Sequence, residues 1–363
     1  PLSGVEEDEY FDVLPWAETA AEYLMGFILK KKMPRKLKVG FSNSPRNISH
    51  ATYRDLGFAA TPEGKFDVYS AGGLGRDARM GVKVAENIDP EKILCYIQAM
   101  WLTFCTYGNY ENRNRARSRY MQKALGGPEE YRRAYQEKLR EVMMSGGNSD
   151  LQVKQRKILK TGDGSRISGK RVFAQKQTGL YTVIWHPLGG IPRPEVVCNL
   201  SDILGDMDEA ELRLAPDETA YIINLTGKEA QEVLKVTADC AESRFETSVS
   251  CIGAQICQIG LRDSQGLLRS CIEAVKSAGI PDRALPQMHI SGCPSSCGTH
   301  QTGRIGFRGS FLLIDKMPQP AYVLYVNGCE LQGKEQFGRE VGTMLETDIP
   351  DFLVELGKTV AES

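Results

Sequence analysis

The sequence predicts an α+β fold in which short strands alternate with amphipathic helices in three successive parts of the chain. Length gives the first indication, because 363 residues exceed what one hydrophobic core usually serves. An internal repeat gives the second, since it relates the beginning of the chain to its end. A run of short strands and helices between the two copies gives the third. We place the three parts at residues 1–145, 146–237 and 238–363.

The internal repeat becomes visible when the sequence is shifted by 249 positions, which places NSPRNISHATYRDLGF (43–58) over GCPSSCGTHQTGRIGF (292–307). A little further on, VYSAGG (68–73) matches LYVNGC (324–329). Ser44 and Ile48 stand in the first copy where the second has Cys293 and Cys297. We interpret the copies as an ancient duplication in which only one half kept a metal site.

The first part of the chain begins with a helix, continues with strands and ends in a long helical region. The expected elements are a helix over 17–32, a strand over 35–41, a strand over 65–73, and helices from 89 to 144 with a break near 126–130. In the 35–41 strand, alternation would place Lys36 and Lys38 together on one face.

The middle part follows a stretch rich in Gly, Ser and Asp, over about 145–170, which reads as a linker or exposed loop. We expect strands over 170–176, 180–186 and 219–225, and helices near 200–210 and 228–237. This order is typical of a ferredoxin-like half-unit.

Composition excludes several functional classes. The formal net charge is -1, which gives no general attraction to nucleic acid or to an anionic membrane. No apolar run approaches the roughly 20 residues that a membrane span needs. Ten clustered cysteines in a chain of this length favour metal ligation in a reducing compartment, so a cytoplasmic location is expected. The chain starts at Pro1 in what reads as a loop, and we expect it to be the later portion of a longer protein in which a targeting peptide could precede it.

A run of arginines resembles a nucleic-acid-binding arm. Its members are Arg113, Arg115, Arg117 and Arg119. On a helix, a step of two residues would spread them around the axis, and interleaved aromatic side chains for base stacking are lacking. A solvated, helix-capping set is therefore favoured, with a possible share in docking a cofactor or an acidic donor.

Four cysteines lie in two short segments, CIGAQIC (251–257) and SGCPSSCG (291–298). Sets of four thiolates hold zinc or an iron–sulfur cluster. The spacing of Cys251 and Cys257 lies just outside the usual range of a zinc knuckle, and a cubane cluster tolerates more varied spacing. Ordinary buried cysteines are the alternative, as we expect for Cys95, Cys105 and Cys271 on helical stripes. The residues alone thus favour a cluster at Cys251, Cys257, Cys293 and Cys297.

These cysteine segments resemble the siroheme and [4Fe–4S] signature of the nitrite and sulfite reductase family. Further segments similar to that family, in the same order, are PRKLK (34–38), DLGF (55–58), GGLGR (72–76), NRNRARSRYMQKALG (112–126), FAQKQTGLYTV (173–183) and ELRLAPDETAYII (211–223). The resemblance covers essentially the whole chain. It implies a siroheme reductase fold with two siroheme-type repeats and the ferredoxin-like half-unit between them.

The resemblance also implies cofactors and their residues. The four cysteines would bind a [4Fe–4S] cluster, and Cys297 would also bridge to the iron of siroheme. Siroheme carries eight carboxylates, so basic residues should surround it. The candidates at matching positions are Arg35, Gly72, Gly73, Arg76, Ser295 and Gly298, with the glycines allowing close backbone approach.

The substrate expected from the resemblance is a small oxyanion that needs fixed cations. Lys36 and Lys38 form a K-x-K pair at a place where sulfite reductases of the family carry it, so they are the candidate catalytic residues for reduction of sulfite to sulfide. Two solvated lysines are the alternative. CIGAQIC, in contrast, resembles nitrite reductases and some ferredoxin-linked sulfite reductases, and reduction of nitrite to ammonia stays open. Ala215, Glu218 and Thr219 replace the Thr, Gln and Asn common in the family.

Partners follow from what the sequence lacks. No Walker loop or dinucleotide-binding fingerprint is present, so electrons should come from a ferredoxin or a flavoprotein. The family's two active-site arginines would lie upstream, and we expect the isolated chain to be inactive without that N-terminal portion. A non-catalytic iron–sulfur or zinc-binding module is the alternative of another class.

Overall fold

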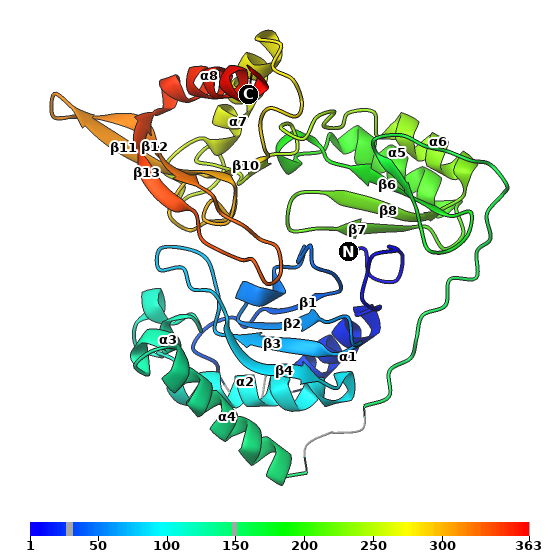
Figure 1. Cartoon of the computed structure of the whole chain (residues 1–363), viewed down its shortest axis with the longest axis vertical. Coiled ribbons are helices and arrows are strands. Elements are labelled where there is room, and N and C mark those ends of the chain that lie inside the picture. The colour runs from blue at the N-terminus through cyan, green and yellow to red at the C-terminus, as the bar shows by residue number, and fades with distance from the viewer. Residues whose placement is uncertain (27–31, 147–150, 363) are drawn as a thin grey trace. The chain divides into compact units, whose positions relative to one another are not determined.

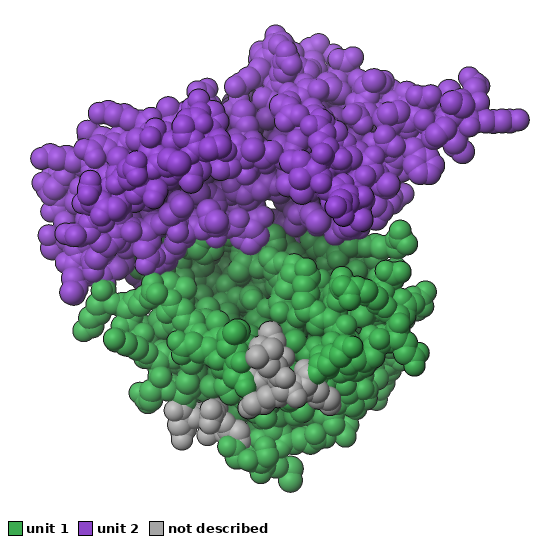
Figure 2. Space-filling model, turned by 180° about the vertical axis from the view of Figure 1, so that it is seen from behind, with its two compact units in different colours: residues 1–157, 331–333 green, residues 158–330, 334–363 purple. Residues whose placement is uncertain are grey.

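The computed structural model describes residues 1–26, 32–146 and 151–362, and it divides into two compact units. Unit 1 contains Pro1–Lys157 and Leu331–Gly333, and unit 2 contains Ile158–Glu330 and Lys334–Ser363 (Figure 2). The described residues form three sheets with helices, a mixed α+β architecture that agrees with the predicted fold class (Figure 1). No helix among them is long and apolar enough to cross a membrane.

Unit 1 is built on a sheet in the order β1-β2-β3-β4, with β1 and β2 parallel and the other pairs antiparallel. Its strands are β1 (Val39–Ser42), β2 (Leu56–Ala60), β3 (Phe66–Ser70) and β4 (Val82–Ile88). Its helices are α1 (Leu14–Met25), α2 (Ile93–Tyr107), α3 (Tyr120–Ala124) and α4 (Pro128–Met144), with 3₁₀ turns η1 (Ala51–Tyr53), η2 (Pro90–Lys92) and η3 (Arg113–Arg115).

The helices of unit 1 cover one face of this sheet (Figure 1). Phe58 and Phe66 from the sheet and Met100 and Tyr135 from the helices are fully buried in one core. Helix α4 starts at Pro128, whose fixed φ suits the first helical position. Acidic residues in its first turn face the positive end of the helix dipole.

Unit 2 contains an antiparallel sheet in the order β5-β6-β8-β7. Its elements are β5 (Val172–Ala174), β6 (Tyr181–Trp185), η4 (Leu188–Gly190), α5 (Pro194–Gly205), β7 (Glu211–Leu214), β8 (Ala220–Leu225) and α6 (Gly227–Val236). Helix α6 begins with a capping box, in which the Thr226 N–H donates to Glu229 Oε2 at 2.7 Å and the Glu229 N–H donates to Thr226 Oγ1 at 3.4 Å.

The last sheet of unit 2 has the order β13-β12-β11-β10-β9. Its strands are β9 (Val249–Ser250), β10 (Met288–Ser291), β11 (Ile305–Ile314), β12 (Met317–Val326) and β13 (Arg339–Leu345). The accompanying elements are α7 (Ser264–Ser277), η5 (Glu346–Asp348) and α8 (Ile349–Glu362). Both helices pack on one face of the sheet, around Phe307 and Tyr322.

The strand register of the two units reproduces the sequence repeat. Val39 pairs with Leu56 in unit 1 and Met288 pairs with Ile305 in unit 2, an offset of 249 at both positions. Beyond the β11–β12 hairpin, which is longer than β2–β3, the offset becomes 256, because Gly57 pairs with Tyr69 and Gly306 with Tyr325. The predicted repeat is therefore present in the strand pairing.

Several predicted boundaries were wrong. The strand expected over 35–41 begins only at Val39, so Lys36 and Lys38 precede it. The first helix starts earlier than expected, at Leu14, and residues 27–31 of its predicted end lie outside the described residues. The helical region over 89–144 is also interrupted between Gly108 and Arg119. Residues 109–119 contain no Pro or Gly, so the sequence did not indicate this long irregular segment. Strands β4 and β7 had not been predicted.

Candidate cofactor and anion sites

The two cysteine segments begin at one edge of the unit 2 sheet. Cys251 directly follows β9, and Cys293 follows β10 after Gly292. These strands are parallel neighbours, with Ile290 opposite Ser250, so their carboxyl ends reach the same edge. The prediction that both segments meet at one place agrees with this topology.

Hydrogen bonds connect the two segments at that edge. The Cys251 N–H donates to Ile290 O at 3.1 Å, and the Gly292 N–H donates to Cys251 Sγ at 3.1 Å. The hydroxyl of Ser264, at the start of α7, lies 3.2 Å from the same sulfur. A sulfur that receives a backbone hydrogen bond and has a hydroxyl beside it is suited to carry the negative charge of a metal-bound thiolate.

Glycine is required where the second cysteine segment turns back. A Cβ on Gly298 would lie 2.0 Å from Ile290 O, so no larger residue fits there. The Gly298 N–H donates to Ser291 Oγ at 3.1 Å, and neighbouring Ser295 is exposed. Gly298 thus has a structural reason of its own, and its predicted contact with a cofactor stays a prediction, as does that of Ser295.

The four cysteines differ in exposure. Cys293 is buried, Cys251 and Cys257 are half-buried, and Cys297 is exposed. Among the described residues, no group of three His, Cys, Asp or Glu side chains converges closely enough to hold one metal ion.

A carboxyl group that the sequence had marked only as a substitution lies next to this edge. Both oxygens of Glu218 accept from the Ser250 N–H at 3.1 Å, one residue before Cys251. Glu218 has φ 68, a conformation that few residues except glycine adopt readily. Burial raises the pKa of Glu218 to about 8, against a smaller lowering by its bond from Ser250. Burial thus favours the protonated form of Glu218 in the folded chain.

In unit 1, Lys36 and Lys38 lie beside a buried aspartate. Both lysines are exposed, and the Lys38 N–H donates to Asp55 Oδ2 at 2.9 Å. Asp55 is 1% exposed and also accepts from Arg117 Nη2 at 2.8 Å and from the Ser118 hydroxyl. A single carboxylate therefore fixes the backbone of one predicted substrate residue and the side chain of an unpredicted arginine.

The cations around Asp55 exceed its negative charge. Partial desolvation by the surrounding protein lowers the pKa of Lys38 most, although the residue is exposed. Repulsion from Arg54, Arg117 and Lys36 lowers the pKa further, and attraction by Asp55 opposes the change. We call Lys36, Lys38, Arg54 and Arg117 the Asp55 cation cluster. Such a set of preorganised positive charges can bind a small oxyanion.

A second basic site lies in unit 1 in a cavity of about 420 Å³. The residues that line it are Asp77, Arg79, Tyr107, Asn109, Arg115, Arg119, Tyr120, Met121, Lys123 and Ala124. We call it the basic pocket. Its basic side chains outnumber its one carboxylate, and within the described part of the chain no ion pair engages Arg79, Arg115, Arg119 or Lys123.

Arg119 is the buried member of the basic pocket. It is 8% exposed, its Nε donates to the backbone oxygen of Asp77 at 2.9 Å, and its guanidinium lies 4.8 Å from the centre of the Tyr120 ring. Burial lowers the pKa of Arg119, and the charge of Arg117 adds to the lowering. A buried guanidinium without a carboxylate partner in the described residues is costly and is a sign of an anion site.

The solvated, helix-capping set expected for the arginine run is confirmed only in part. Arg113 and Arg115 are exposed in the short turn η3, and Arg119 is the N-cap residue of α3. Arg119 is buried, however, Arg117 is half-buried, and no continuous helix carries the four residues. The reason is local, because the Asn112 side chain accepts from the Asn114 N–H and holds a turn where a helix had been assumed.

The remaining predicted residues belong to unit 1. Gly72 has no room for a side chain, since a Cβ would lie 2.7 Å from the Tyr53 backbone. Gly73, with φ 155, faces the Arg119 side chain, where a Cβ would lie 3.5 Å from Arg119 Cδ. Arg35 is half-exposed and Arg76 is exposed. Only Gly73 is thus placed next to a basic pocket residue.

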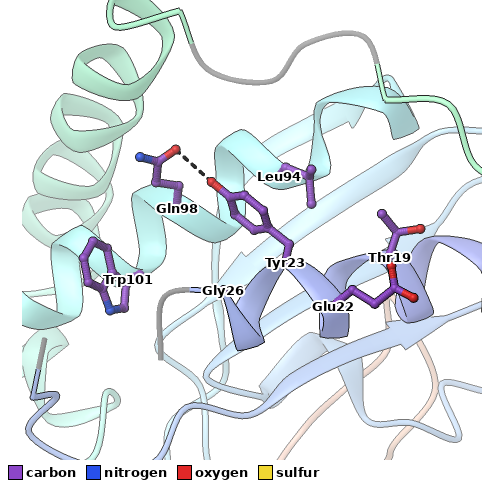
Figure 3. A pocket seen from close by; sticks show the side chains of 7 residues that line it. All are labelled: Thr19, Glu22, Tyr23, Gly26, Leu94, Gln98 and Trp101. Carbon is purple, nitrogen blue, oxygen red and sulfur yellow. Dashed lines mark hydrogen bonds between the residues drawn. The ribbon is translucent and has the colours of Figure 1, made fainter. Parts of the chain in front are cut away.

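Another cavity of unit 1, of about 520 Å³, is lined by none of the predicted residues (Figure 3). Thr19, Glu22, Tyr23, Gly26, Leu94, Gln98 and Trp101 line it. The Tyr23 hydroxyl donates to Gln98 Oε1 at 3.1 Å and links α1 to α2. This cavity is mostly apolar and carries no charge suited to the chemistry of the other sites.

Paired cysteine segments and clustered cations on a duplicated α+β scaffold are features of a redox protein that handles anions. Residues 1–143 match the family described as nitrite and sulphite reductase 4Fe-4S domain. This match covers the first part of the chain, and the chain as a whole is similar to nitrite and sulfite reductases.

Individual relatives carry both names of that family. The chain is 25% identical over 328 residues to the chloroplastic ferredoxin–nitrite reductase of Spinacia oleracea, covering 85% of this chain and 53% of that one. It is 22% identical over 326 residues to sulfite reductase [ferredoxin] 1 of Mycolicibacterium paratuberculosis, covering 86% and 56%. The chain thus spans about half the length of these relatives.

A solved structure has the same fold. The Mycobacterium tuberculosis NirA protein superposes with a TM-score of 0.77 at 19% identity, over 100% of this chain and 69% of that one. The mixed α+β fold with its three sheets among the described residues is therefore that of NirA.

Proposed function

We propose that this chain is the cofactor- and substrate-binding part of a reductase that converts sulfite to sulfide with six electrons, using siroheme coupled to a [4Fe–4S] cluster. The observation that carries the proposal is the Asp55 cation cluster, because it places Lys36 and Lys38 among further fixed positive charges. Similarity to a ferredoxin–nitrite reductase and to a ferredoxin sulfite reductase supports the reduction of a small oxyanion as the class of reaction.

The cluster would be held by Cys251, Cys257, Cys293 and Cys297. The residues present fit it, because the cysteine segments start at one sheet edge and a backbone N–H already donates to Cys251 Sγ. When bound, a cluster supplies electrons one at a time. The chain's part is to fix the thiolates and to neutralise their charge with hydrogen bonds.

Siroheme would bind through its carboxylates to basic side chains. Arg119 in the basic pocket supports this. It is buried and has no carboxylate partner among the described residues, and a carboxylate is the partner that such a guanidinium requires. Arg79, Arg115 and Lys123 would add attraction from the same cavity.

The substrate preference rests on charge. Sulfite is a dianion, and two lysines with two neighbouring arginines stabilise a dianion more than singly charged nitrite. Nitrite is the second candidate. It is favoured by the CIGAQIC segment and by the nitrite reductases among the relatives of known name.

The electron donor would be a ferredoxin or a flavoprotein in the cytoplasm. The names of the plant and mycobacterial relatives support a ferredoxin. A non-catalytic cluster- or zinc-binding module remains the alternative of another class, and absorption bands of siroheme distinguish it from a reductase.

The test is a comparison of kcat/KM for sulfite and nitrite in the complete protein, with reduced viologen as electron donor. A higher value for sulfite supports the proposal, and a higher value for nitrite replaces the substrate by the second candidate. Protein without siroheme absorption and without turnover of either anion contradicts the reductase and leaves the module.

A further inference from the structure

The sulfur of Cys251 has a side-chain neighbour that the proposed function does not use. Ser264, the first residue of α7, is fully buried, and its Oγ lies 3.2 Å from Cys251 Sγ and 2.7 Å from Cys251 O. The fit is tight, because a Cβ on Gly253 would come within 2.9 Å of the same hydroxyl. Ser264 therefore has little freedom to point elsewhere.

The hydrogen-bond partners of this hydroxyl depend on the state of the sulfur. A thiol can donate to Ser264 Oγ while the hydroxyl donates to Cys251 O. A metal-bound thiolate has no proton and can only accept, so the hydroxyl becomes the donor to sulfur. Cys251 O would keep a partner, since the Ser250 hydroxyl donates to it at 3.4 Å. The turn of the hydroxyl therefore leaves no buried carbonyl without a hydrogen bond.

The duplicated half offers an internal comparison. Tyr10 donates its N–H to Asn43 O at 2.8 Å in unit 1, as Leu261 donates to Gly292 O at 3.0 Å in unit 2. Arg262 also donates to Gly292 O, at 2.9 Å, so the position of Ser264 falls at Asp12 or Val13, and neither carries a hydroxyl. The hydroxyl is thus present in the copy with cysteines and absent from the copy without them.

A second equivalence completes the comparison. Gly4 and Gly253 both have positive φ, 86 and 68, in the corresponding loops. Two residues earlier, unit 1 has Leu2 where unit 2 has Cys251, and Leu2 is fully buried. A buried leucine occupies the position of the Cys251 thiol, and no hydroxyl stands at the position of Ser264, which associates Ser264 with the copy that carries the cysteines.

We propose that Ser264 is a positioning residue that donates a hydrogen bond to the Cys251 thiolate and raises the reduction potential of the cluster. The inference rests on the proposed function, because it requires the cluster. A hydrogen bond to a cluster thiolate stabilises the reduced form most, since that form carries one more negative charge. The step is the uptake of one electron from an external reductant, with no bond made or broken.

The experiment is an EPR-monitored titration of the complete protein with dithionite, in wild type and in Ser264→Ala, Ser264→Gly and Ser264→Thr. Without the hydroxyl, we expect the equilibrium constant for reduction to fall roughly three- to tenfold, about 30–60 mV for one electron. Threonine keeps the hydroxyl and should keep the wild-type potential. Ser270→Ala is the matched control, since Ser270 is an exposed serine of the same helix.

A spectroscopic signature complements the potential. The Ser264 proton exchanges with deuterium, so the reduced cluster should show one exchangeable proton coupling that Ser264→Ala loses. An alanine variant with an intact cluster, an unchanged potential and the same coupling overturns the inference. Loss of iron from both Ala and Gly variants, with Thr retaining it, would make Ser264 a structural support and also overturn the tuning role. Wild-type protein without iron and labile sulfide would instead overturn the proposed function itself.

Discussion

Arg117 Nη2 lies 2.8 Å from Asp55 Oδ2, and the same oxygen accepts from the Lys38 N–H at 2.9 Å. The aspartate side chain is fully buried, whereas the arginine side chain retains 21% of its exposed surface. One carboxylate thus determines where the chain enters β1 and where an arginine of the distant 108–119 turn is held. The backbone position of the exposed Lys38 depends on this buried anion.

Replacing Asp55 by alanine should destabilise unit 1 strongly. The substitution leaves the Lys38 N–H, the Ser118 hydroxyl and the Arg117 guanidinium without their common acceptor. Breaking a buried ion pair from one side costs about 3–5 kcal/mol, and we expect a loss of that order in the free energy of unfolding. Urea unfolding followed by circular dichroism measures it.

Asp89→Asn is the control for this measurement. Asp89 is paired with Lys65 and Lys92 at 3.1 Å, but all three side chains are exposed. Exposed pairs contribute little, so its unfolding midpoint should stay near that of the wild type. Equal losses in the two variants would show that Asp55 has no special role.

Arg119→Met should separate stability from binding. The guanidinium is buried without a carboxylate partner in the described residues, so its removal relieves a desolvation cost while it loses one backbone hydrogen bond. We expect the free energy of unfolding to change by no more than about 1 kcal/mol. Siroheme content per chain, read from its absorption, should fall at least tenfold. Arg133→Met, in an exposed pair on α4, is the control; normal siroheme content in Arg119→Met would contradict the role of the basic pocket.

Glu218 should make the stability of the chain decrease as pH rises. Its pKa is about 8 in the folded chain and 4.5 ordinarily, so the folded state binds more protons than the unfolded state between these values. Stability is therefore greatest below pH 4.5 as far as this group is concerned, and it is lost as pH approaches 8, by at most about 1.4 kcal/mol per pH unit.

Glu218→Gln removes that proton linkage and keeps an acceptor for the Ser250 N–H. We expect the variant to gain on the wild type progressively from pH 5 to pH 8 in urea unfolding. Parallel curves for the two proteins over this range would mean that Glu218 is already ionised in the folded chain.

The meeting of the two cysteine segments at one sheet edge could be predicted because the relevant information is local and periodic. Cys251 and Cys293 each follow a short strand, and the repeat of Gly57-Phe58 in Gly306-Phe307 carries the pairing register from one copy to the other. Parallel pairing of β9 with β10 then follows from chain order and brings both segments to one edge.

The unit 1 sites could not be derived in the same way. Arg117 and Asp55 are 62 positions apart, and nothing in the sequence near either residue indicates the other. The arginine run was predicted to lie in a helix. In the structure, the side-chain oxygens of Asn109 and Asn112 accept hydrogen bonds from nearby backbone N–H groups, and these bonds compete with helix formation. Lys36 and Lys38 were predicted as substrate residues from their charge and from a strand expected to contain them. The strand starts after them, at Val39.

Lys38 and Lys36 should contribute unequally to sulfite reduction. Lys38 is fixed through its own backbone to Asp55 and feels the charges of Arg54 and Arg117, whereas Lys36 has no such backbone bond among the described residues. We expect Lys38→Met to lower kcat/KM for sulfite about 100-fold and Lys36→Met about tenfold. The loss for nitrite should be smaller in both variants, because a monoanion interacts less strongly with each charge. Lys65→Met, at an exposed pair with Asp89, should leave both substrates unaffected. Equal, small effects of all three substitutions would mean that Lys36 and Lys38 are solvated surface lysines and that the anion is bound by other residues.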